Sequence, residues 1–433
     1  MFQDGFTMSL DDILKKLDAE TRSRMARKVP SWFSVIPGSD RESLIFPSSL
    51  STQQCSSENT ALYKARVAFQ ALAADSKPLE ELHSAKATFR PLPLPTASSD
   101  ENLYSTGPSP CPCPGVDTSS RGFCLPQGRI SDLTGGLGVD SWAFSKCFEK
   151  VLYNEANTEL AEAVKHNFEV LGCSNITISN RLLEPGNLKD ILGDFKPDVI
   201  FLDPARRSAA GKKVFLLEDC QPDVLKLKDE LLAASPNLLL KLSPMADITM
   251  LLQRLGNVRE THVVAFDGEC KELLLLLQRG WSGPSELIIH EDGITIGPLE
   301  QTTIQGNAYA KDIQPGLILY EPGKALLKAG LFDYPCTLGY TKIARHTHLY
   351  IAPDTTEAPL PGKYFRIEKV LPLQSKTIKE IARQGISAEV SSHNVPIKAE
   401  DLRTRLHATP SATSHLFAAG GIDDNYILIT SVI

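Results

Sequence analysis

The sequence lacks any long apolar run. Its longest is five consecutive leucines at residues 273–277, whereas a membrane-spanning helix needs about 20 apolar residues. The first residues include acidic side chains and no apolar stretch of the length that a signal peptide requires. We therefore expect no membrane partner, no export and a cytoplasmic location.

Paired cysteines at metal-binding spacing are also missing. The chain has nine cysteines, an odd number, scattered without a repeated interval. Cys111 and Cys113 lie close together, but prolines surround them and no second pair or histidine cluster accompanies them. We expect reduced thiols and no metal site.

An excess of basic residues is missing as well. The net charge is -7, with 42% hydrophobic and 22% charged residues, which is ordinary for a globular protein. This balance argues against a surface coated in positive charge for nucleic acid, but a local basic patch stays compatible with it. A chain of 433 residues exceeds one compact core, so we expect about two to four domains.

Composition divides the chain into five segments. Residues 1–74 form a helical region, with helices expected at 9–29 and 57–73. Residues 75–127 are rich in proline and serine, which indicates a linker or insertion without its own core. The remaining segments are an α/β domain at 128–282, a small α+β module at 283–355 that we expect to be ferredoxin-like, and a second α+β domain at 356–433.

Strand and helix patterns alternate throughout the third segment. Strands are expected at 128–134, 150–156, 176–181, 198–204 and 237–244, and helices at 139–148, 157–172, 187–195, 224–235 and 246–256. Such alternation predicts a Rossmann-like, doubly wound parallel sheet. Two further strands, 261–267 and 271–279, are too close together for a crossover, so they predict an antiparallel hairpin at the sheet edge.

A glycine-rich stretch, DLTGGLGVD, follows the first strand. Gly135, Gly136 and Gly138 would let the backbone approach a ligand closely, although their spacing differs from the Gly-x-Gly-x-x-Gly of dinucleotide sites. Glu155 ends the second strand about 20 residues later, where an acid can accept both hydroxyls of a ribose. The pattern predicts a nucleoside-type ligand; the alternative is a tight turn beside a solvent-facing glutamate.

A second unusual stretch, FLDPARR, ends the fourth strand. It places Asp203, a stiffening Pro204 and the arginines Arg206 and Arg207 at the carboxyl edge of the sheet. The arginines could bind an anionic substrate or simply pair with acids at 218–219. Lys241 ends the buried fifth strand and is a further candidate to line the cleft.

Together these stretches resemble the class I S-adenosylmethionine-dependent methyltransferases. DLTGGLGVD is similar to the first motif of that family, with Thr134 in place of its usual first glycine, and DPAR is similar to the [Asp/Asn]-Pro-Pro-[aromatic] motif. Residues 48–69 and 317–332 resemble segments of a methyltransferase family that has a helical N-terminal region and a C-terminal THUMP-like domain.

The resemblance implies S-adenosyl-L-methionine as cofactor and a set of site residues. Cofactor binding is implied for Asp132, Thr134, Gly135, Gly136, Gly138, Glu155, Asn180 and Asp203. A catalytic role is implied for Asp203, Pro204 and Arg206, and substrate binding for Arg206, Arg207, Lys241 and Ser243. Asp203 would orient the target, since methyl transfer from a sulfonium depends on positioning and needs no metal. In the N-terminal region, Gln54, Ser57 and Lys64 could help to close the site.

Two departures from the family pattern limit the expected chemistry. Arg206 stands where an aromatic side chain would stack on a base, which puts an adenine-type target in doubt. Ser243 stands after the fifth strand, where enzymes that methylate uracil at carbon 5 need a nucleophilic cysteine. The sequence therefore argues against a covalent C5 mechanism.

The leading hypothesis is a methyltransferase that acts on RNA, either tRNA or rRNA, and docks it through the C-terminal modules. The acidic net charge favours an alternative, a small-molecule or protein substrate, and the basic residues across 363–405 are interleaved with acids as on a solvated face. The missing aromatic in DPAR favours another alternative, a non-catalytic nucleic-acid-binding protein that retains the fold. The glycine spacing disfavours an NAD-dependent dehydrogenase.

Overall fold

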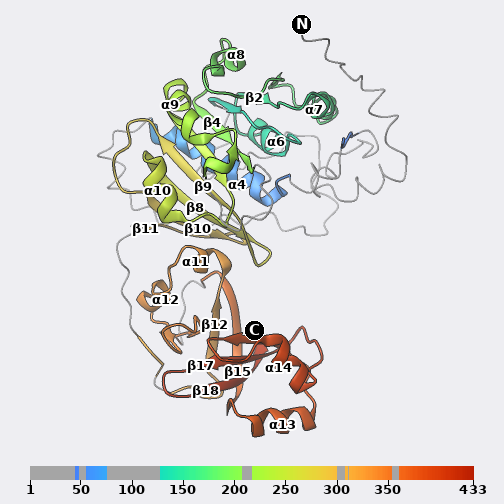
Figure 1. Ribbon diagram of the computed structural model, residues 1–433, viewed down its shortest axis with the longest axis vertical. Coiled ribbons are helices and arrows are strands. Elements are labelled where there is room, and N and C mark those ends of the chain that lie inside the picture. Colours follow the sequence, from blue (N-terminus) through green and yellow to red (C-terminus); the bar gives the residue numbers. More distant parts are fainter. Residues whose placement is uncertain are drawn as a thin grey trace, which may run out of the picture. The chain divides into compact units, whose positions relative to one another are not determined.

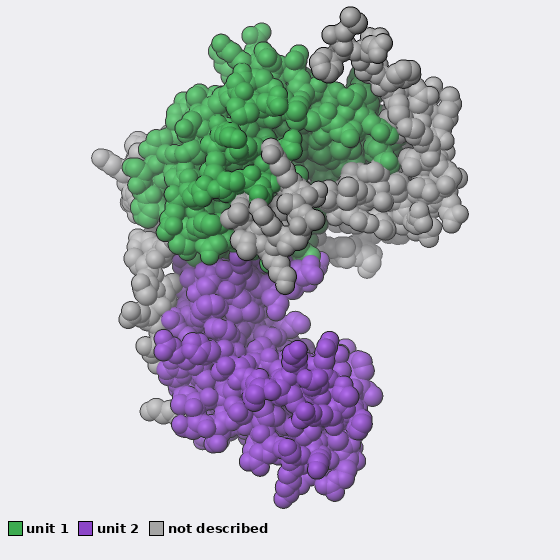
Figure 2. Space-filling view, viewed as in Figure 1, with its two compact units in different colours: residues 1–266, 271–288 green, residues 267–270, 289–433 purple. Residues whose placement is uncertain are grey.

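A computed structural model describes residues 44–47, 55–75, 127–206, 217–299, 308–310, 312–353 and 360–433. The chain forms two compact units, which Figure 2 shows in different colours. Unit 1 comprises residues 1–266 and 271–288, and unit 2 comprises residues 267–270 and 289–433. The expected helix at 9–29 and the linker at 75–127 lie outside the described residues, apart from position 75 and position 127.

Seven strands of unit 1 run in the order β8-β9-β7-β4-β1-β2-β3 within a sheet of nine strands. Their bounds are β1 (Arg129–Asp132), β2 (Lys150–Asn154), β3 (Ile176–Ser179), β4 (Val199–Leu202), β7 (Asn237–Leu242), β8 (Val258–Phe266) and β9 (Glu269–Gln278). The pairings from β3 to β7 are parallel, and β9 runs antiparallel to β7. The predicted hairpin is confirmed, with its second strand inserted between the first strand and the parallel sheet (Figure 1).

Helices link these strands and cover the sheet. They are α6 (Val139–Ser145), α7 (Thr158–Val170), α8 (Leu188–Leu192), α9 (Val224–Ala234) and α10 (Ile248–Leu255). Three of them begin where a side-chain oxygen accepts a backbone N–H of the first turn, at Asn157, Asp223 and Asp247. Such caps stabilise a helix by about 1 kcal/mol each, so local sequence places the helix starts.

The central strand β4 is apolar on both faces, as expected of a covered parallel sheet. Val199 and Phe201 belong to the core that contains residues of α6 and α7. Ile200 and Leu202, which alternate with them and so face the other way, are also buried. Because β4 contains only apolar residues, the first side chain on this part of the chain that can bind a polar ligand is the one directly after the strand.

The N-terminal helix predicted at 57–73 is confirmed as α4 (Glu58–Asp75). Its small and apolar side chains, among them Ala61, Val67 and Ala68, join the same core as α6. Tyr63 donates to or accepts from Nδ1 of His262 on β8 at 2.9 Å. The helix is therefore an integral layer of unit 1. Among the described residues, no helix has the length and apolarity needed to cross a bilayer.

Unit 2 is built on one sheet of order β13-β14-β12-β15-β18-β17-β16. The strands are β12 (Ile318–Pro322), β13 (Thr341–Lys342), β14 (Tyr350–Ile351), β15 (Gly362–Pro372), β16 (Glu389–His393), β17 (Ser414–Gly420) and β18 (Asn425–Val432). The helices are α11 (Lys324–Lys328), α12 (Tyr334–Thr337), α13 (Ser375–Gln384) and α14 (Ala399–Leu406). The chain passes from unit 1 to unit 2 within β10 (Glu286–Glu291), which precedes β11 (Ile294–Leu299).

The predicted fold class is confirmed: a largely parallel, doubly wound sheet with an antiparallel hairpin, preceded by a helical element and followed by small α+β modules. The hairpin is not the last pair of strands, since two strands precede β8 in the sheet order. The division into five segments stays a prediction.

Candidate active site

The glycine-rich turn between β1 and α6 is fixed by hydrogen bonds from the neighbouring strand β2. The amide of Gly135 donates to the carbonyl of Asn154 at 2.8 Å, and the hydroxyl of Tyr153 donates to the carbonyl of Gly136 at 2.6 Å. The amide of Gly136 donates to Oε2 of Glu155 at 2.9 Å. The turn and Glu155 therefore form one rigid unit at the carboxyl ends of two parallel strands.

Two of the glycines in this turn are required by space. A Cβ on Gly135 would lie 2.1 Å from the ring of Tyr153. Gly138 has a φ of +78° and a Cβ there would lie 2.7 Å from the ring of Phe168. By contrast, a Cβ on Gly136 would meet only a backbone oxygen at 3.9 Å, although its φ is +51°. The sequence pattern thus has a steric cause at the first and last glycine.

Asp132 lies beneath the turn and is 1% exposed. Its carboxyl oxygens accept the amide of Thr134 at 3.2 Å and the hydroxyl of Ser141 at 2.7 Å. Burial raises the pKa of Asp132 to about 8, against the lowering effect of the Ser141 hydrogen bond. The side chain thus orders the turn and the start of α6 from below.

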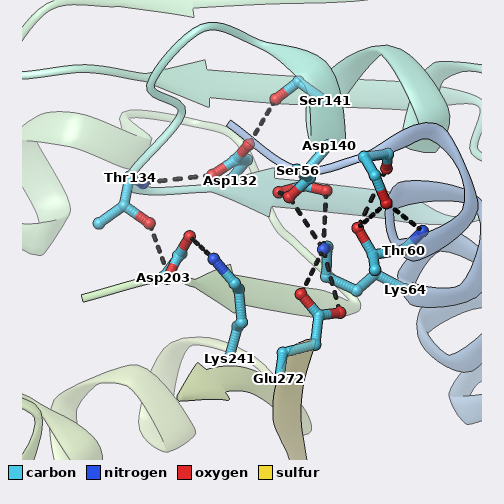
Figure 3. Close-up of polar contacts among 11 residues, drawn as sticks. Ser56, Thr60, Lys64, Asp132, Thr134, Asp140, Ser141, Asp203, Lys241 and Glu272 are labelled. Carbon is cyan, nitrogen blue, oxygen red and sulfur yellow. Dashed lines mark hydrogen bonds and ion pairs between the residues drawn. The ribbon is translucent and has the colours of Figure 1, made fainter. Parts of the chain in front are cut away.

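Thr134 connects the turn to the FLDPARR stretch (Figure 3). Its hydroxyl accepts the backbone N–H of Asp203 at 2.7 Å. After Pro204 the chain forms β5 (Ala205–Arg206), which pairs antiparallel with β6 (Cys220–Gln221). The hydrogen bond at Asp203 and the strand pairing of Ala205 and Arg206 hold the stretch in place, and the stiffening by Pro204 stays a prediction.

Asp203 forms an ion pair with Lys241, which reaches it from β7 (Figure 3). Nζ of Lys241 lies 2.5 Å from Oδ2 of Asp203. Burial by itself lowers the pKa of Lys241, but the carboxylates of Asp203 and Glu272 raise it more, and its pKa lies above the usual range. Lys241 therefore stays charged at neutral pH.

A second, buried charge cluster lies beside this pair. Nζ of Lys64 on α4 lies 3.0 and 3.2 Å from the two carboxylate oxygens of Glu272 and 3.2 Å from Asp140. The hydroxyl of Ser56 donates to Asp140 at 2.8 Å and accepts from Lys64 at 3.0 Å. Figure 3 shows Lys64 at the centre of these groups. The N-terminal region is thus tied to the first turn of α6 and to β9.

A cavity of about 400 Å³ opens between these elements. Polar walls come from Ser56, Thr134, Asp140, Glu155 and Asp203, and apolar walls from Leu137, Val139, Ala156, Leu160, Leu182 and Leu183. Gly135, Gly136 and Cys55 also line it. In the described part of the chain, no three His, Cys, Asp or Glu side chains come together as a metal site would require.

The structure brings some of the predicted residues to this cavity and leaves others away from it. Asn180 instead donates to the backbone carbonyl of Glu155 at 2.6 Å, so it supports that residue from outside. Ser243 accepts the amide of Met245 at 3.2 Å and orders the turn after β7. Pro204 is buried in the stretch that follows β4.

Three predicted residues have no described side chain. For Arg206 the backbone position in β5 is described and the side chain is not, while Gln54 and Arg207 lie outside the described residues. Glu218, one of the two acids considered as their partner, pairs with Arg254 of α10.

Sequence reasoning missed Cys55, Ser56 and Asp140 as lining residues. Asp140 is the last residue of the DLTGGLGVD stretch, so its position in the first turn of α6 was a usable signal. Cys55 and Ser56 precede α4, and nothing local indicates that they reach the cavity. Burial and the nearby Asp140 raise the pKa of the Cys55 thiol to about 11, which makes a reactive thiolate unfavourable.

Comparisons with known proteins agree with this architecture. A family model described as THUMP domain-like matches residues 362–431, and one described as a ferredoxin-like domain matches residues 319–358. A crystal structure described as a candidate methyltransferase from Porphyromonas gingivalis W83 is similar over 99% of this chain and 95% of its own, with 26% identity and a TM-score of 0.71. A search of curated proteins found no match.

Other solved structures match only part of the chain. An rRNA methylase from Streptococcus thermophilus covers 35% of this chain and 87% of its own, with 15% identity and a TM-score of 0.26. A candidate methyltransferase from Streptococcus mutans in complex with SAH covers 36% of this chain and 89% of its own, with 11% identity and a TM-score of 0.27.

Three findings agree: the strand order with its inserted antiparallel strand, the near full-length structural match, and the two family matches. The chain has the fold of a class I methyltransferase, followed by a ferredoxin-like and a THUMP-like domain.

Proposed function

We propose that this protein is an S-adenosylmethionine-dependent methyltransferase that modifies RNA. One observation carries the proposal: Glu155 and Asp203 line the same cavity, and both are held by the glycine-rich turn that lies between them in the sheet. Ligands of doubly wound sheets bind at this edge. The two acids supply a cofactor subsite and a substrate subsite next to each other.

The residues around Glu155 fit the nucleoside part of the cofactor. Each carboxylate oxygen of Glu155 accepts one backbone N–H, from Gly136 and from Asn157, and each keeps a second lone pair. Ribose hydroxyls can donate to those remaining positions. Leucines at 160, 182 and 183 line the same cavity and offer an apolar surface for an adenine ring. S-adenosylmethionine would supply an electrophilic methyl group there.

Asp203 is suited to orient the group that receives the methyl. Lys241 contacts Oδ2, so the other carboxylate oxygen can accept an N–H or O–H from the substrate. Thr134 and Pro204 restrict the backbone on both sides, which keeps Asp203 in one position.

RNA is the proposed substrate because of the C-terminal domains. A THUMP-like domain occupies residues 362–431 and a ferredoxin-like domain precedes it, and small α+β modules of this kind are typical RNA-binding elements. The proposed enzyme docks RNA through them and performs direct methyl transfer in the cavity of unit 1.

Cofactor binding is tested by isothermal titration of S-adenosylhomocysteine into the full chain. Glu155→Ala removes the proposed ribose acceptor, and the affinity should fall by about tenfold or more. Glu162→Ala is the matched control, since Glu162 is exposed on α7 and does not line the cavity. Absence of binding to the wild type, or equal loss in both variants, would refute the cofactor site.

Substrate identity is tested by mass spectrometry of RNA nucleosides from cells with and without the protein. A methylated nucleoside should be missing from cells that lack the protein. It should return when the wild-type protein is supplied and stay absent when Asp203→Ala is supplied. Asp229→Ala is the control because Asp229 is an exposed acid on α9. Full restoration by Asp203→Ala would exclude the proposed role of that residue. Cofactor binding with an unchanged nucleoside profile would favour a small-molecule or protein substrate.

A further inference from the structure

A second cavity, of about 540 Å³, lies within unit 2. Its walls come from Tyr309, from Phe332 and Asp333 before α12, and from residues 342–348 around the connection between β13 and β14. Its volume is within the usual range of small-ligand sites, roughly 300–1,000 Å³. The methyl-transfer chemistry proposed above uses none of its residues.

The charge of this cavity is positive. Lys342 is 4% exposed and forms an ion pair with Asp333, so these two charges compensate each other. Arg345 and His346 are exposed, and neither has a hydrogen bond or ion pair with any residue that the structure describes. An unpaired guanidinium next to an imidazole is a typical arrangement for binding phosphate.

Aromatic rings form another part of the wall. The ring of Phe332 stacks on His348 with centroids 4.2 Å apart and planes 28° apart, and Tyr309 also lines the cavity. Within the described part of the chain, Nδ1 of His348 is buried without a hydrogen-bond partner. Burial and the nearby positive groups, Lys342 first among them, lower the pKa of His348, so its ring adds a neutral, polarisable surface to the cavity.

We propose that this cavity binds a nucleoside phosphate. Arg345 and His346 would hold the phosphate, and the base would pack against the rings of Phe332 and Tyr309. Aromatic stacking contributes to nucleotide binding for every base, whereas an inorganic anion or an acidic peptide would use only the cationic half of the wall. The site stands apart from methyl transfer and does not depend on it.

Isothermal titration with the full chain separates the two halves of the ligand without any substitution. The probes are uridine 5′-monophosphate, ribose 5-phosphate and uridine. None of them carries adenine, so their binding in the proposed cofactor cavity of unit 1 should be weak. We expect the monophosphate to bind about tenfold or more tightly than either fragment. Equal binding of uridine and its monophosphate, or no measurable binding of the monophosphate, would overturn the proposal.

A pair of arginine variants locates the binding. Arg345→Ala should weaken uridine monophosphate about tenfold, and Arg405→Ala, an exposed arginine of α14 outside the cavity, should leave it unchanged. Both positions are exposed, so neither change removes core packing. Equal weakening by the two substitutions would place the nucleotide elsewhere and refute the site.

The source of the nucleotide is distinguished by a short oligouridylate with a 5′-phosphate. If the oligomer binds more tightly than the monophosphate, and Arg345→Ala removes this difference, the site is supported and RNA is the source of the nucleotide. If the two bind equally, the site is supported and free nucleotide is the source. Competition by an oligoglutamate peptide as effective as by the monophosphate would overturn the nucleotide proposal. Binding of S-adenosylhomocysteine should be the same in Arg345→Ala and wild type, so a failure here is separate from a failure of the methyltransferase proposal.

Discussion

Replacing Lys64 by methionine should destabilise the attachment of α4 strongly. The side chain is fully buried, and its ammonium is the cation shared by the carboxylates of Glu272 and Asp140. Methionine fills a similar volume but leaves two buried acids without that partner. Breaking a buried ion pair in this way typically costs about 3–5 kcal/mol, which corresponds to a more than hundredfold change in an opening equilibrium.

The loss should depend on the protonation of Glu272. Burial raises the pKa of Glu272 despite the opposing effect of Lys64, so a freed Glu272 can take up a proton and reduce the penalty. The measurement is therefore made at mildly alkaline pH. Hydrogen exchange and mass spectrometry of peptides from α4 report the local free energy of opening, and Lys165→Met, an exposed lysine on α7, is the control.

A second substitution tests whether the buried charges of Lys64 and Glu272 act together. Adding Glu272→Met to Lys64→Met removes one of the unpaired acids and should restore part of the opening free energy, because contacting residues couple in double-mutant cycles. A loss below about 1 kcal/mol in Lys64→Met, or simple additivity of the two changes, would refute the claim that the cluster fixes α4.

Three more predictions concern the glycine-rich turn. Gly135→Ala should lower the Tm more than Gly136→Ala in circular dichroism, since its Cβ would lie 2.1 Å from a tyrosine ring while the other would meet nothing nearer than 3.9 Å; equal losses would contradict the steric account. Thr134→Val removes the acceptor of the Asp203 amide, so exchange of that amide should accelerate about tenfold or more, and an unchanged rate would exclude the connection. The pKa of Asp132 is about 8 in the folded protein, against an ordinary value of 3.8, so its contribution to the free energy of unfolding is fully present below the lower value and is lost as pH rises through the higher one. The Tm of the wild type should therefore fall relative to Asp132→Asn between about pH 5 and pH 8, and parallel curves would contradict the buried, protonated carboxyl.

The meeting of the candidate site residues was predictable because parallel strands bring their carboxyl ends together. Glu155 and Asp203 stand directly after β2 and β4, and Gly135 follows β1 by three positions, so their meeting at one edge follows from topology. The steric need for glycine also agrees with the motif. Local sequence was sufficient to place a residue at the site wherever its position is set by the strand that it follows.

The contacts that fix the site could not be predicted in the same way. Lys64 and Glu272 are 208 positions apart, and Thr134 and Asp203 are 69 apart. Nothing in the neighbouring residues of either pair specifies its partner, because tertiary packing decides it. Asp132 is a further example: its motif position implies cofactor contact, which stays a prediction, and nothing in the sequence indicates that its side chain is buried under the turn.

The sheet of unit 2 has a consequence for how its two modules can be separated. The ferredoxin-like match ends at residue 358 and the THUMP-like match begins at residue 362. Nevertheless β12, in the first match, pairs with β15, in the second, from Ile318 to Pro322. Cutting the chain between the matches would expose two bare strand edges, which favour intermolecular pairing and aggregation. The ferredoxin-like and THUMP-like domains should therefore be expressed, truncated and transplanted as one piece.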